Sequence, residues 1–324
     1  MLDALLPLLH YLDITPPTAG QCWAEWTITP IAGGANNLLY RVTNGQADYA
    51  IKFTVRDERN RVGREFAALT ALQTAGLTIA PQAIGYDVDR FRQPVIVQSW
   101  LMGDLLTGPP QTQAEWLALL DHYCLIHSFR PEQTAVALAE AVLNMANGAA
   151  GKALIEQQVA NLPLAARPTS LQAILIWLQR WTPPTWSTPP RTLCRVDGNW
   201  RNFIRQPQGL LSVDWENSGW GDPAFELADL MTHPAYTSVD LATWLWLSEA
   251  YATASGDQTA VIRIQTYYTL MLVWWLVRWA RFLYEVPRGL DVRLAARSPH
   301  WESETEQNYS HYLTKIETHL ATFS

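Results

Sequence analysis

The hydrophobic pattern of this chain changes near residue 100, and this change limits the folds that the chain can adopt. Before that point, short stretches of alternating polarity are separated by turn-forming residues, which is typical of β-strands. After Pro109 and Pro110, apolar residues recur at helical spacing. We therefore expect an α+β, bilobal protein: a small antiparallel sheet with one main helix over residues 1–100, and a larger, mainly α-helical lobe over residues 101–324.

Strand patterns in the first part occur at 27–31, 38–43, 49–53, 84–86 and 94–101, with a tight turn at Asn44-Gly45. One helix interrupts them, because Val62, Phe66 and Leu69 recur at helical spacing. Gly76 is suited to end that helix, since glycine commonly caps helices at their C-termini.

The second part begins with Thr112 and Glu115, which are spaced for a capping box at a helix N-terminus. Further helices are expected at 170–181 and from Val239 onward, and the segment 130–167 is helical by composition. Two short strands are expected at 192–197 and 210–214, folded back on each other by the turn at Gln206 to Gly209.

Charge and cysteine content exclude several classes of protein. The net charge is −7 and no run of basic residues exists, so a nucleic acid partner is not expected. The three cysteines are odd in number and widely spaced, which favours neither a disulfide framework nor a zinc site.

The most apolar segment, Ile264 to Val277, is shorter than the ~20 residues that span a bilayer, so it predicts a buried helix and no membrane partner. The start, Met1-Leu2-Asp3, lacks the cationic flank of a signal peptide. A cytoplasmic protein is the expectation, and no oligomeric state is indicated.

The first candidate site is the segment Gly33-Gly34-Ala35-Asn36-Asn37. It lies between two expected strands, whereas a Rossmann turn lies between a strand and a helix, and no Walker P-loop sequence is present. Taken alone, a glycine pair between strands is more often a simple hairpin.

Lys52 is the second candidate, because it lies in an expected strand and Glu65 follows 13 residues later. An isolated strand lysine usually faces solvent. Glu65, however, borders the buried face of the expected helix, and a charge in that position requires a partner. A strand lysine held by a helix glutamate is how protein-kinase-like folds place an ammonium group against nucleotide phosphates.

Asp197, Asn202 and Asp214 form the most specific pattern, spaced by five and twelve residues around the expected turn. Such a hairpin brings three oxygen-bearing side chains to one point. Asn202 and Asp214 supply the oxygen ligands that Mg²⁺ prefers, which leaves Asp197 to accept a proton from a hydroxyl group. For any one of these residues a turn-forming role is the simpler interpretation; the full order and spacing favour the site.

From about Ile31 to Leu230 the sequence resembles the aminoglycoside phosphotransferase and choline kinase family, which has the protein-kinase-like fold. The resemblance lies in the G-G-x-x-N-x-x-Y-R-V opening, the strand lysine, the D-x-x-x-x-N loop and the V-D-W-E segment. Its most specific part is the segment from Gly221 to Asp229, which resembles the signature G-D-P-x-x-D-L-A with Glu226 in place of aspartate.

This resemblance implies ATP and Mg²⁺ as cofactors and a small hydroxyl-bearing molecule as the second substrate. Carried over, Gly33, Gly34, Ala35, Asn36 and Asn37 cover the phosphates through their backbone. Lys52 contacts the α and β phosphates and is oriented by Glu65.

The remaining implied roles fall in and after the last expected strand of the sheet. Asp197 is the catalytic base or hydroxyl-orienting group, and Asn202 and Asp214 bind Mg²⁺. The backbone of Gln98, Ser99 and Trp100 holds adenine at an inter-lobe hinge. Asp222 is implied to be architectural, and His127 is interpreted as core packing with a polar tip.

The loop around Asp197 departs from the family's H-G-D and L-H-P-G-N sequences, with Arg195 at the position of the histidine that is thought to brace the loop. This departure concerns loop geometry more than chemistry. Arg201 is hypothesised to place a cation near the transferred phosphoryl group.

The leading prediction is an ATP- and Mg-dependent phosphotransferase that acts on a hydroxyl of an aminoglycoside-, choline- or sugar-like molecule. The alternatives are a nucleotide-binding protein without phosphotransfer and a helical interaction protein. Tryptophans of the second lobe could enclose a ring or a quaternary ammonium group, although packing is the simpler role for most of them: Trp215, Trp220, Trp244, Trp246, Trp274, Trp275 and Trp279. Glu216 and Asp229 could instead meet a polyamine.

Overall fold

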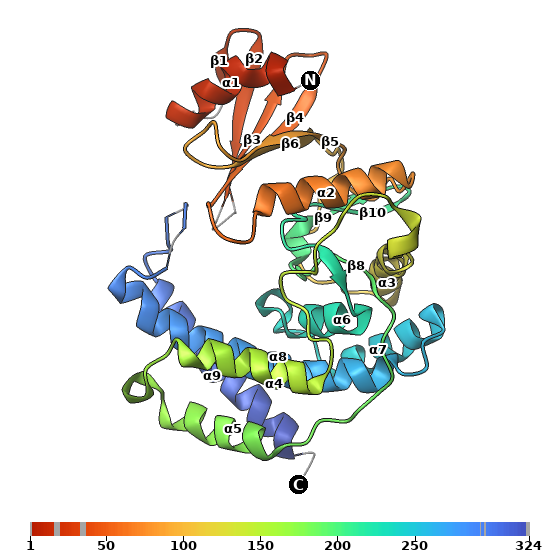
Figure 1. The fold of residues 1–324 in the computed structure, drawn as a ribbon, viewed down its shortest axis with the longest axis vertical. Coiled ribbons are helices and arrows are strands. Elements are labelled where there is room, and N and C mark those ends of the chain that lie inside the picture. The colour runs from red at the N-terminus through yellow and green to blue at the C-terminus, as the bar shows by residue number, and fades with distance from the viewer. Residues whose placement is uncertain (1, 16–19, 33–36, 292, 295, 322–324) are drawn as a thin grey trace.

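The computed structural model describes residues 2–15, 20–32, 37–291, 293–294 and 296–321. Figure 1 shows a β-sheet with two helices at the N-terminal end of the molecule and a larger group of helices toward the C-terminus. We call residues 2–99 the sheet region and residues 103–321 the helical region. The expected mixed composition, with an antiparallel sheet followed by helices, is confirmed.

The main sheet has six strands in the order β1-β2-β3-β4-β6-β5, and all of its pairings are antiparallel. The five expected strands are present, and a short strand, β1, precedes them. The bounds are β1 Gln21–Trp23, β2 Trp26–Ile31, β3 Asn37–Thr43, β4 Asp48–Thr54, β5 Ala83–Asp87 and β6 Val95–Ser99.

Helix α1 (Leu2–Ile14) covers one face of this sheet, and the sequence analysis did not predict it. It buries Leu5, Leu8, Leu9 and Leu12 in one cluster with Ile28 and other strand residues of that face. The spacing of these leucines is helical. The sheet region therefore has two main helices, whereas one was expected.

Helix α2 (Arg61–Thr74) packs against β5 and β6, as the apolar spacing predicts. The helix ends at Thr74, and Gly76, just beyond the C-cap residue Ala75, has a φ of +73°, a left-handed conformation that glycine adopts without steric cost. Val62 and Leu69 share a core cluster with Ile96 and with Trp215 of the helical region. This cluster joins the two regions.

Two small sheets lie beside α2 and carry the chemistry-bearing segments. One has the order β10-β9-β7 and the other pairs β11 with β8. Their bounds are β7 Asp104–Leu105, β8 Thr192–Cys194, β9 Phe203–Gln206, β10 Gly209–Ser212 and β11 Gly219–Gly221. The turn at Gln206 to Gly209 is confirmed, but it joins β9 to β10. The expected pairing of 192–197 with 210–214 is wrong, because β8 pairs with β11.

The two strands expected at 192–197 and 210–214 are shorter than predicted. β8 ends at Cys194 and β10 ends at Ser212. Val196 and Asp214 have φ of +53° and +63°, a left-handed conformation that cannot continue a strand. The chain therefore leaves the extended conformation immediately around the candidate residues Asp197 and Asp214.

Helix α8 is the centre of the helical region and packs against α4, α6, α7 and α9. The capping box at Thr112 is confirmed at the start of α3, as is the helix expected at 170–181. The helices are α3 Gln113–His127, α4 Gly148–Ala160, α5 Thr169–Arg180, α6 Pro223–Thr232, α7 Leu241–Ser255, α8 Ala260–Glu285 and α9 Trp301–Leu320. Short 3₁₀ turns occur at Pro131–Gln133, Leu164–Ala166, Trp200–Asn202, Pro234–Tyr236 and Val286–Arg288.

Two further expectations about helices need correction. The segment 130–167 is helical mainly over Gly148–Ala160, and most of 134–147 is irregular. The apolar helix expected at 264–277 spans Ala260–Glu285, so it is long enough to cross a bilayer. Because 72% of its most apolar window is buried inside the protein, α8 is a core helix, as predicted.

Candidate active site

Lys52 occupies the middle of β4, where it pairs in register with Leu39 of β3 and Ile96 of β6. Its side chain is only 5% exposed. The ammonium nitrogen lies 2.7 Å from Glu65 Oε2 of α2 and 2.5 Å from Asp214 Oδ1, which follows β10. The structure thus brings together three of the predicted site residues, from the sheet, from α2 and from the helical region.

Glu216 is a further carboxylate beside Lys52, with Oε2 at 3.4 Å from the ammonium nitrogen. Burial alone would lower the pKa of Lys52, but Asp214, Glu65 and Glu216 outweigh it and raise the pKa well above its usual value. Lys52 therefore carries its positive charge at any physiological pH.

The pKa values of the two carboxyl groups beside Lys52 shift in opposite directions. Burial raises the pKa of Glu65 to about 7, although the neighbouring Lys52 opposes this shift. Burial also acts to raise the pKa of Asp214, but the Lys52 charge and hydrogen bond outweigh it and lower the pKa. Asp214 is consequently the stronger acid and remains ionised at neutral pH.

The hairpin sets Asn202 beside Asp214. Phe203 pairs with Ser212 in the ladder, and the Val213 N–H donates to the Asn202 carbonyl at 2.9 Å. Amide and carboxylate oxygens are suitable ligands for Mg²⁺. The donor chemistry of this pair fits the metal that the sequence predicts.

Two other clusters of potential ligands occur in the described part of the chain. Oxygen atoms of Glu65, Asp214 and Glu216 lie within 4.8 Å of one another around the Lys52 ammonium group. His127, Cys194 and Glu226 also lie within that distance. Burial raises the pKa of the Cys194 thiol well above its usual value, so the thiol carries its proton in the metal-free protein.

Asp197 lies in a loop that Glu226 of α6 holds by its backbone. Glu226 Oε1 accepts hydrogen bonds from the N–H groups of Arg195 and Val196, at 2.9 and 2.8 Å. Its other oxygen lies 2.8 Å from His127 Nε2, and His127 Nδ1 lies 3.0 Å from the Tyr251 hydroxyl. His127 is buried with both ring nitrogens partnered, as its interpretation as a core residue with a polar tip predicts.

Arg195 is fully buried and joins the two functional segments. Its guanidinium donates to the Asp197 carbonyl and, at 3.1 Å, to the Val213 carbonyl, and it lies 4.8 Å from the centre of the Phe203 ring. Arginine thus connects the loop to the segment that carries Asp214. With arginine in place of the family's histidine at position 195, the loop is still held by side-chain hydrogen bonds.

Burial raises the pKa of Asp197 to about 6, and the nearby Arg195 charge opposes a larger shift. Asp229, one helical turn after Glu226, is buried beside the same loop and accepts a hydrogen bond from the Gly198 N–H. Burial and the charges of Asp197 and Glu226 raise the pKa of Asp229 to about 8. Asp197 is therefore ionised at neutral pH, whereas Asp229 is largely protonated.

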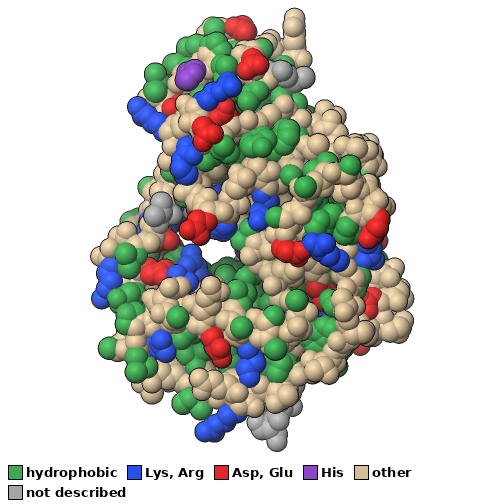
Figure 2. Space-filling model, viewed as in Figure 1, with side chains coloured by type: hydrophobic (Ala, Val, Ile, Leu, Met, Phe, Trp, Pro, Cys, Tyr) green, Lys and Arg blue, Asp and Glu red, His purple; other side chains and the backbone are tan. Residues whose placement is uncertain are grey.

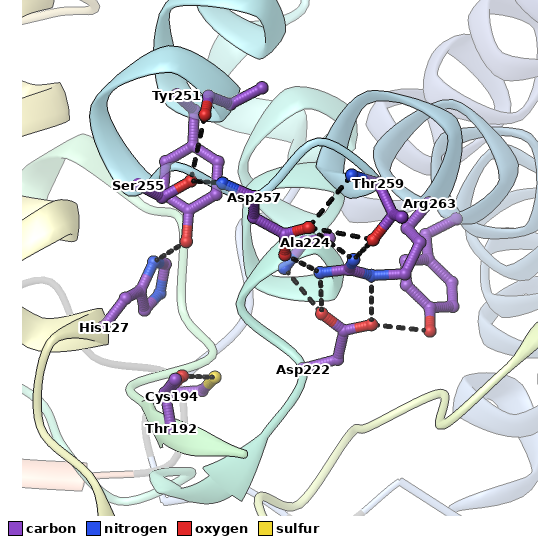
Figure 3. A network of polar contacts seen from close by, with 12 residues as sticks. His127, Thr192, Cys194, Asp222, Ala224, Tyr251, Ser255, Asp257, Thr259 and Arg263 are labelled. Carbon is purple, nitrogen blue, oxygen red and sulfur yellow. Dashed lines mark hydrogen bonds and ion pairs between the residues drawn. The ribbon is translucent and has the colours of Figure 1, made fainter. Parts of the chain in front are cut away.

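Asp222 is architectural, as the resemblance implies. Its carboxylate caps α6 through the Ala224 N–H, and it pairs with Arg263 at 3.0 Å and with the Tyr267 hydroxyl at 2.9 Å (Figure 3). Because the same helix carries Glu226, this anchoring fixes the residue that holds the loop.

The predicted nucleotide-covering segment, residues 33–37, ends at the first residue of β3. Gly33, Gly34, Ala35 and Asn36 lie outside the described residues. Asn37 begins β3 and donates to Glu216 Oε2 at 3.1 Å.

The hinge segment is closely integrated in the sheet. Gln98 is buried in β6, Ser99 is the last residue of that strand, and Trp100 follows it. The N–H groups of Ser99 and Trp100 donate to the carbonyls of Gln82 and Asp48, both at 3.0 Å. These two N–H groups are therefore already satisfied within the protein.

Sequence reasoning missed Arg61, which is 4% exposed and pairs with Glu216 and, at 2.9 Å, with Asp57. The sequence did indicate a buried position for Arg61, because it lies four residues before Glu65 on the same helix face. A second buried cation thus neutralises Glu216 beside Lys52.

A sheet-borne lysine held by a helix glutamate, opposite a loop aspartate and a hairpin aspartate, is the arrangement of phosphotransferases with a protein-kinase-like fold. The sequence model of the phosphotransferase enzyme family matches residues 27–261, and the chain belongs to this family. No curated protein matches the sequence significantly.

Solved structures share the fold over nearly the whole chain. A choline/ethanolamine kinase family protein from Mesorhizobium loti is 17% identical, with 99% of this chain and 98% of that chain covered and a TM-score of 0.62. Choline kinase LicA from Streptococcus pneumoniae is 16% identical, with 96% and 99% covered and a TM-score of 0.57. A thermostable aminoglycoside phosphotransferase, solved with AMP-PNP and hygromycin B, is 10% identical, with 92% and 94% covered and a TM-score of 0.54.

Proposed function

We propose that this protein transfers the γ-phosphoryl group of ATP to a hydroxyl group of a small molecule in the cytoplasm. The observation that carries the proposal is the contact of the Lys52 ammonium with Glu65 and Asp214, at 2.7 and 2.5 Å. A buried ammonium among carboxylates costs desolvation energy and is retained here where phosphates and a metal would meet. The fold shared with a phosphotransferase that was solved with AMP-PNP supports the nucleotide.

In this proposal, residues near position 100 divide a nucleotide-binding part, 1–100, from a catalytic and substrate-binding part, 101–324. Lys52 binds the α and β phosphates while Glu65 orients its ammonium, and Asn202 and Asp214 hold Mg²⁺. Segment 33–37 covers the phosphates, and the 98–100 segment borders adenine. When bound, Mg·ATP supplies the activated phosphoryl group with its charge partly neutralised.

Asp197 orients the acceptor hydroxyl and accepts its proton. With a pKa of about 6 it is ionised at neutral pH and is still basic enough to hold a proton in the transition state. Arg195 keeps this carboxylate in place through the Asp197 carbonyl. Because phosphoryl transfer depends on positioning and charge, loss of the one aligned carboxylate is expected to be severe.

The test is Asp197→Asn, which preserves size and removes the base. We expect turnover to fall by several powers of ten while Mg·ATP binding changes by less than about threefold. Asp121→Asn, at an exposed carboxylate of α3, is the matched control and should behave as wild type. An Asp197→Asn rate within about tenfold of wild type would refute the assignment. ATP binding without turnover by the wild-type protein would favour the alternative, a nucleotide-binding protein without phosphotransfer.

A further inference from the structure

The proposed function leaves the acceptor unidentified. Figure 2 shows an opening between the sheet region and the helical region, with apolar side chains at its floor and charged side chains at its rim. Figure 1 places the C-terminal end of α8 and the segment between β4 and α2 on opposite sides of it.

A ladder of aromatic side chains leads from the catalytic loop along α8. At Gly198, next to Asp197, an added side chain would meet Leu230 and His233. The His233 ring lies 5.8 Å from the Trp275 ring. Trp275 stacks on Trp279 at 5.5 Å, and Trp279 lies 5.7 Å from Phe282. From Trp275 to Phe282 the helix rises about 10 Å. The ladder therefore connects the place of reaction with the end of α8.

Guanidinium groups gather at the far end of this ladder. Arg278 lies 4.0 Å from the centre of the Phe282 ring, and Arg297 lies 6.0 Å from the same centre. Arg281 and Arg278 share the Glu285 carboxylate. The guanidinium of Arg281 lies 2.5 Å from one of its oxygens, and that of Arg278 lies 3.7 Å from the other. Arg278 is thus incompletely neutralised among the residues that the structure describes.

The electrostatic environment of Arg278 confirms this excess of positive charge. Burial is the largest cause that lowers the pKa of Arg278; together with the charges of Arg281, Arg59 and Arg297, and against Glu285, it brings this pKa to about 10. Arg59 belongs to the segment between β4 and α2, so both sides of the opening contribute cations. Arg297 and Arg59 are paired with Asp291 and Asp57.

The aromatic side chains of the ladder cover one another and leave few open ring faces. The indole N–H groups of Trp275 and Trp279 have no acceptor among the described residues. The rings face one another or Tyr312, and Arg278 already covers Phe282. A quaternary ammonium group would need uncovered ring faces and would meet a guanidinium, whereas an anion could pair with Arg278, whose own partner Glu285 is 3.7 Å away.

We propose that the acceptor is a hydroxyl compound with an apolar body and an anionic end, a carboxylate or a phosphate, which Arg278 binds at the end of the aromatic ladder. This inference rests on the proposed phosphotransfer, because the hydroxyl is placed at Asp197. It assigns Arg278 as a specificity-determining residue. It disfavours the choline-like and polyamine-like acceptors that the sequence left open.

The experiment measures binding of phenylalkyl probes to the full-length protein saturated with Mg·AMP-PNP. Phenylalkyl carboxylates of three chain lengths are compared with their amides and trimethylammonium analogues, and phenylalkyl phosphates distinguish the two anionic sources. We expect an anion of at least one length to bind about tenfold or more tightly than its amide and its cationic analogue.

Arg278→Gln should abolish that preference while leaving amide binding within about twofold. Arg288→Gln is the matched control, because Arg288 also stacks on an aromatic ring of this segment, Tyr284, at 3.9 Å, and it is exposed. It should retain the full preference. Arg278→Lys keeps the charge and should retain part of it, which shows that the Gln variant acts through charge and not through unfolding.

Equal binding of anion and amide at every length, tighter binding of the cation, or an unchanged preference in Arg278→Gln would overturn the proposal. Binding of Mg·AMP-PNP is measured first and separately, without probes. Failure of nucleotide binding contradicts the proposed function itself, whereas nucleotide binding without an anion preference contradicts only this inference.

Discussion

At the scale of single residues, Arg195 holds the loop that carries Asp197, although the family's histidine is absent from this position. The histidine implied at this position is replaced by a guanidinium that reaches two carbonyls, those of Asp197 and Val213. Arginine is charged at all relevant pH values, so the brace does not titrate, as a histidine would. Its charge also holds down the pKa of Asp197 against burial.

Replacement of Arg195 by methionine should therefore change rate and pH dependence together. Two carbonyl groups lose their donor, and turnover should fall by roughly a hundredfold with the KM for ATP within about threefold. Loss of the positive charge should move the acid limb of the kcat/KM profile above its starting point near pH 6. Arg205→Met, at an exposed arginine of β9, is the control; an unmoved acid limb would contradict this role.

Asp229 predicts a pH dependence of stability. Its pKa rises from the ordinary 3.8 to about 8 in the folded protein. The folded state then binds the proton more tightly than the unfolded chain, so the free energy of unfolding falls as pH increases through this range.

Asp229→Asn removes that dependence. Relative to wild type, the variant should gain several kcal/mol of unfolding free energy between about pH 5 and about pH 8.5, as measured by urea denaturation. Asp104→Asn, an exposed position, should show no such gain. If the Asp229→Asn and wild-type curves stay parallel, the carboxyl group is not protonated in the folded state.

At the scale of elements, alternating polarity predicted the central strands, and helical spacing predicted α2, because each of these elements buries one face. The strand ends around Asp197 and Asp214 could not be predicted, since β-branched Val196 and ionised Asp214 take left-handed conformations that local preference disfavours. Tertiary hydrogen bonds, such as that from Val196 N–H to Glu226, hold them there. Helix α1 was detectable in its leucine spacing and was missed.

Helix α1 should be an integral part of the sheet region. Leu9 is fully buried against the sheet, so Leu9→Ala should lower the free energy of unfolding by about 2–5 kcal/mol. Ile14, on the same helix, is 62% exposed, and Ile14→Ala should change it by less than about 0.5 kcal/mol. Equal effects in denaturant titrations would show that α1 does not pack as described.

At the scale of the whole molecule, the site exists only because two regions meet. Lys52 and Glu65 come from the first 100 residues, and Asp214 and Glu216 come from a hairpin more than 140 residues later. Spacing and charge predicted the Lys52–Glu65 pair and, separately, the pattern that contains Asp214. The family resemblance predicted that these two groups form one site. Arg61 was missed although it lies one helical turn before Glu65. The cluster of arginines at the end of α8 could not be foreseen, because Arg59 and Arg297 approach Arg278 only in the folded chain.

The most direct measurement of this convergence is the affinity for Mg·ATP of wild type, Lys52→Met and the control Lys152→Met in α4, each first shown to be folded by its melting curve. We predict at least about tenfold weaker binding for Lys52→Met and a change below about twofold for Lys152→Met. Unaltered Mg·ATP affinity in a folded Lys52→Met protein would contradict the account.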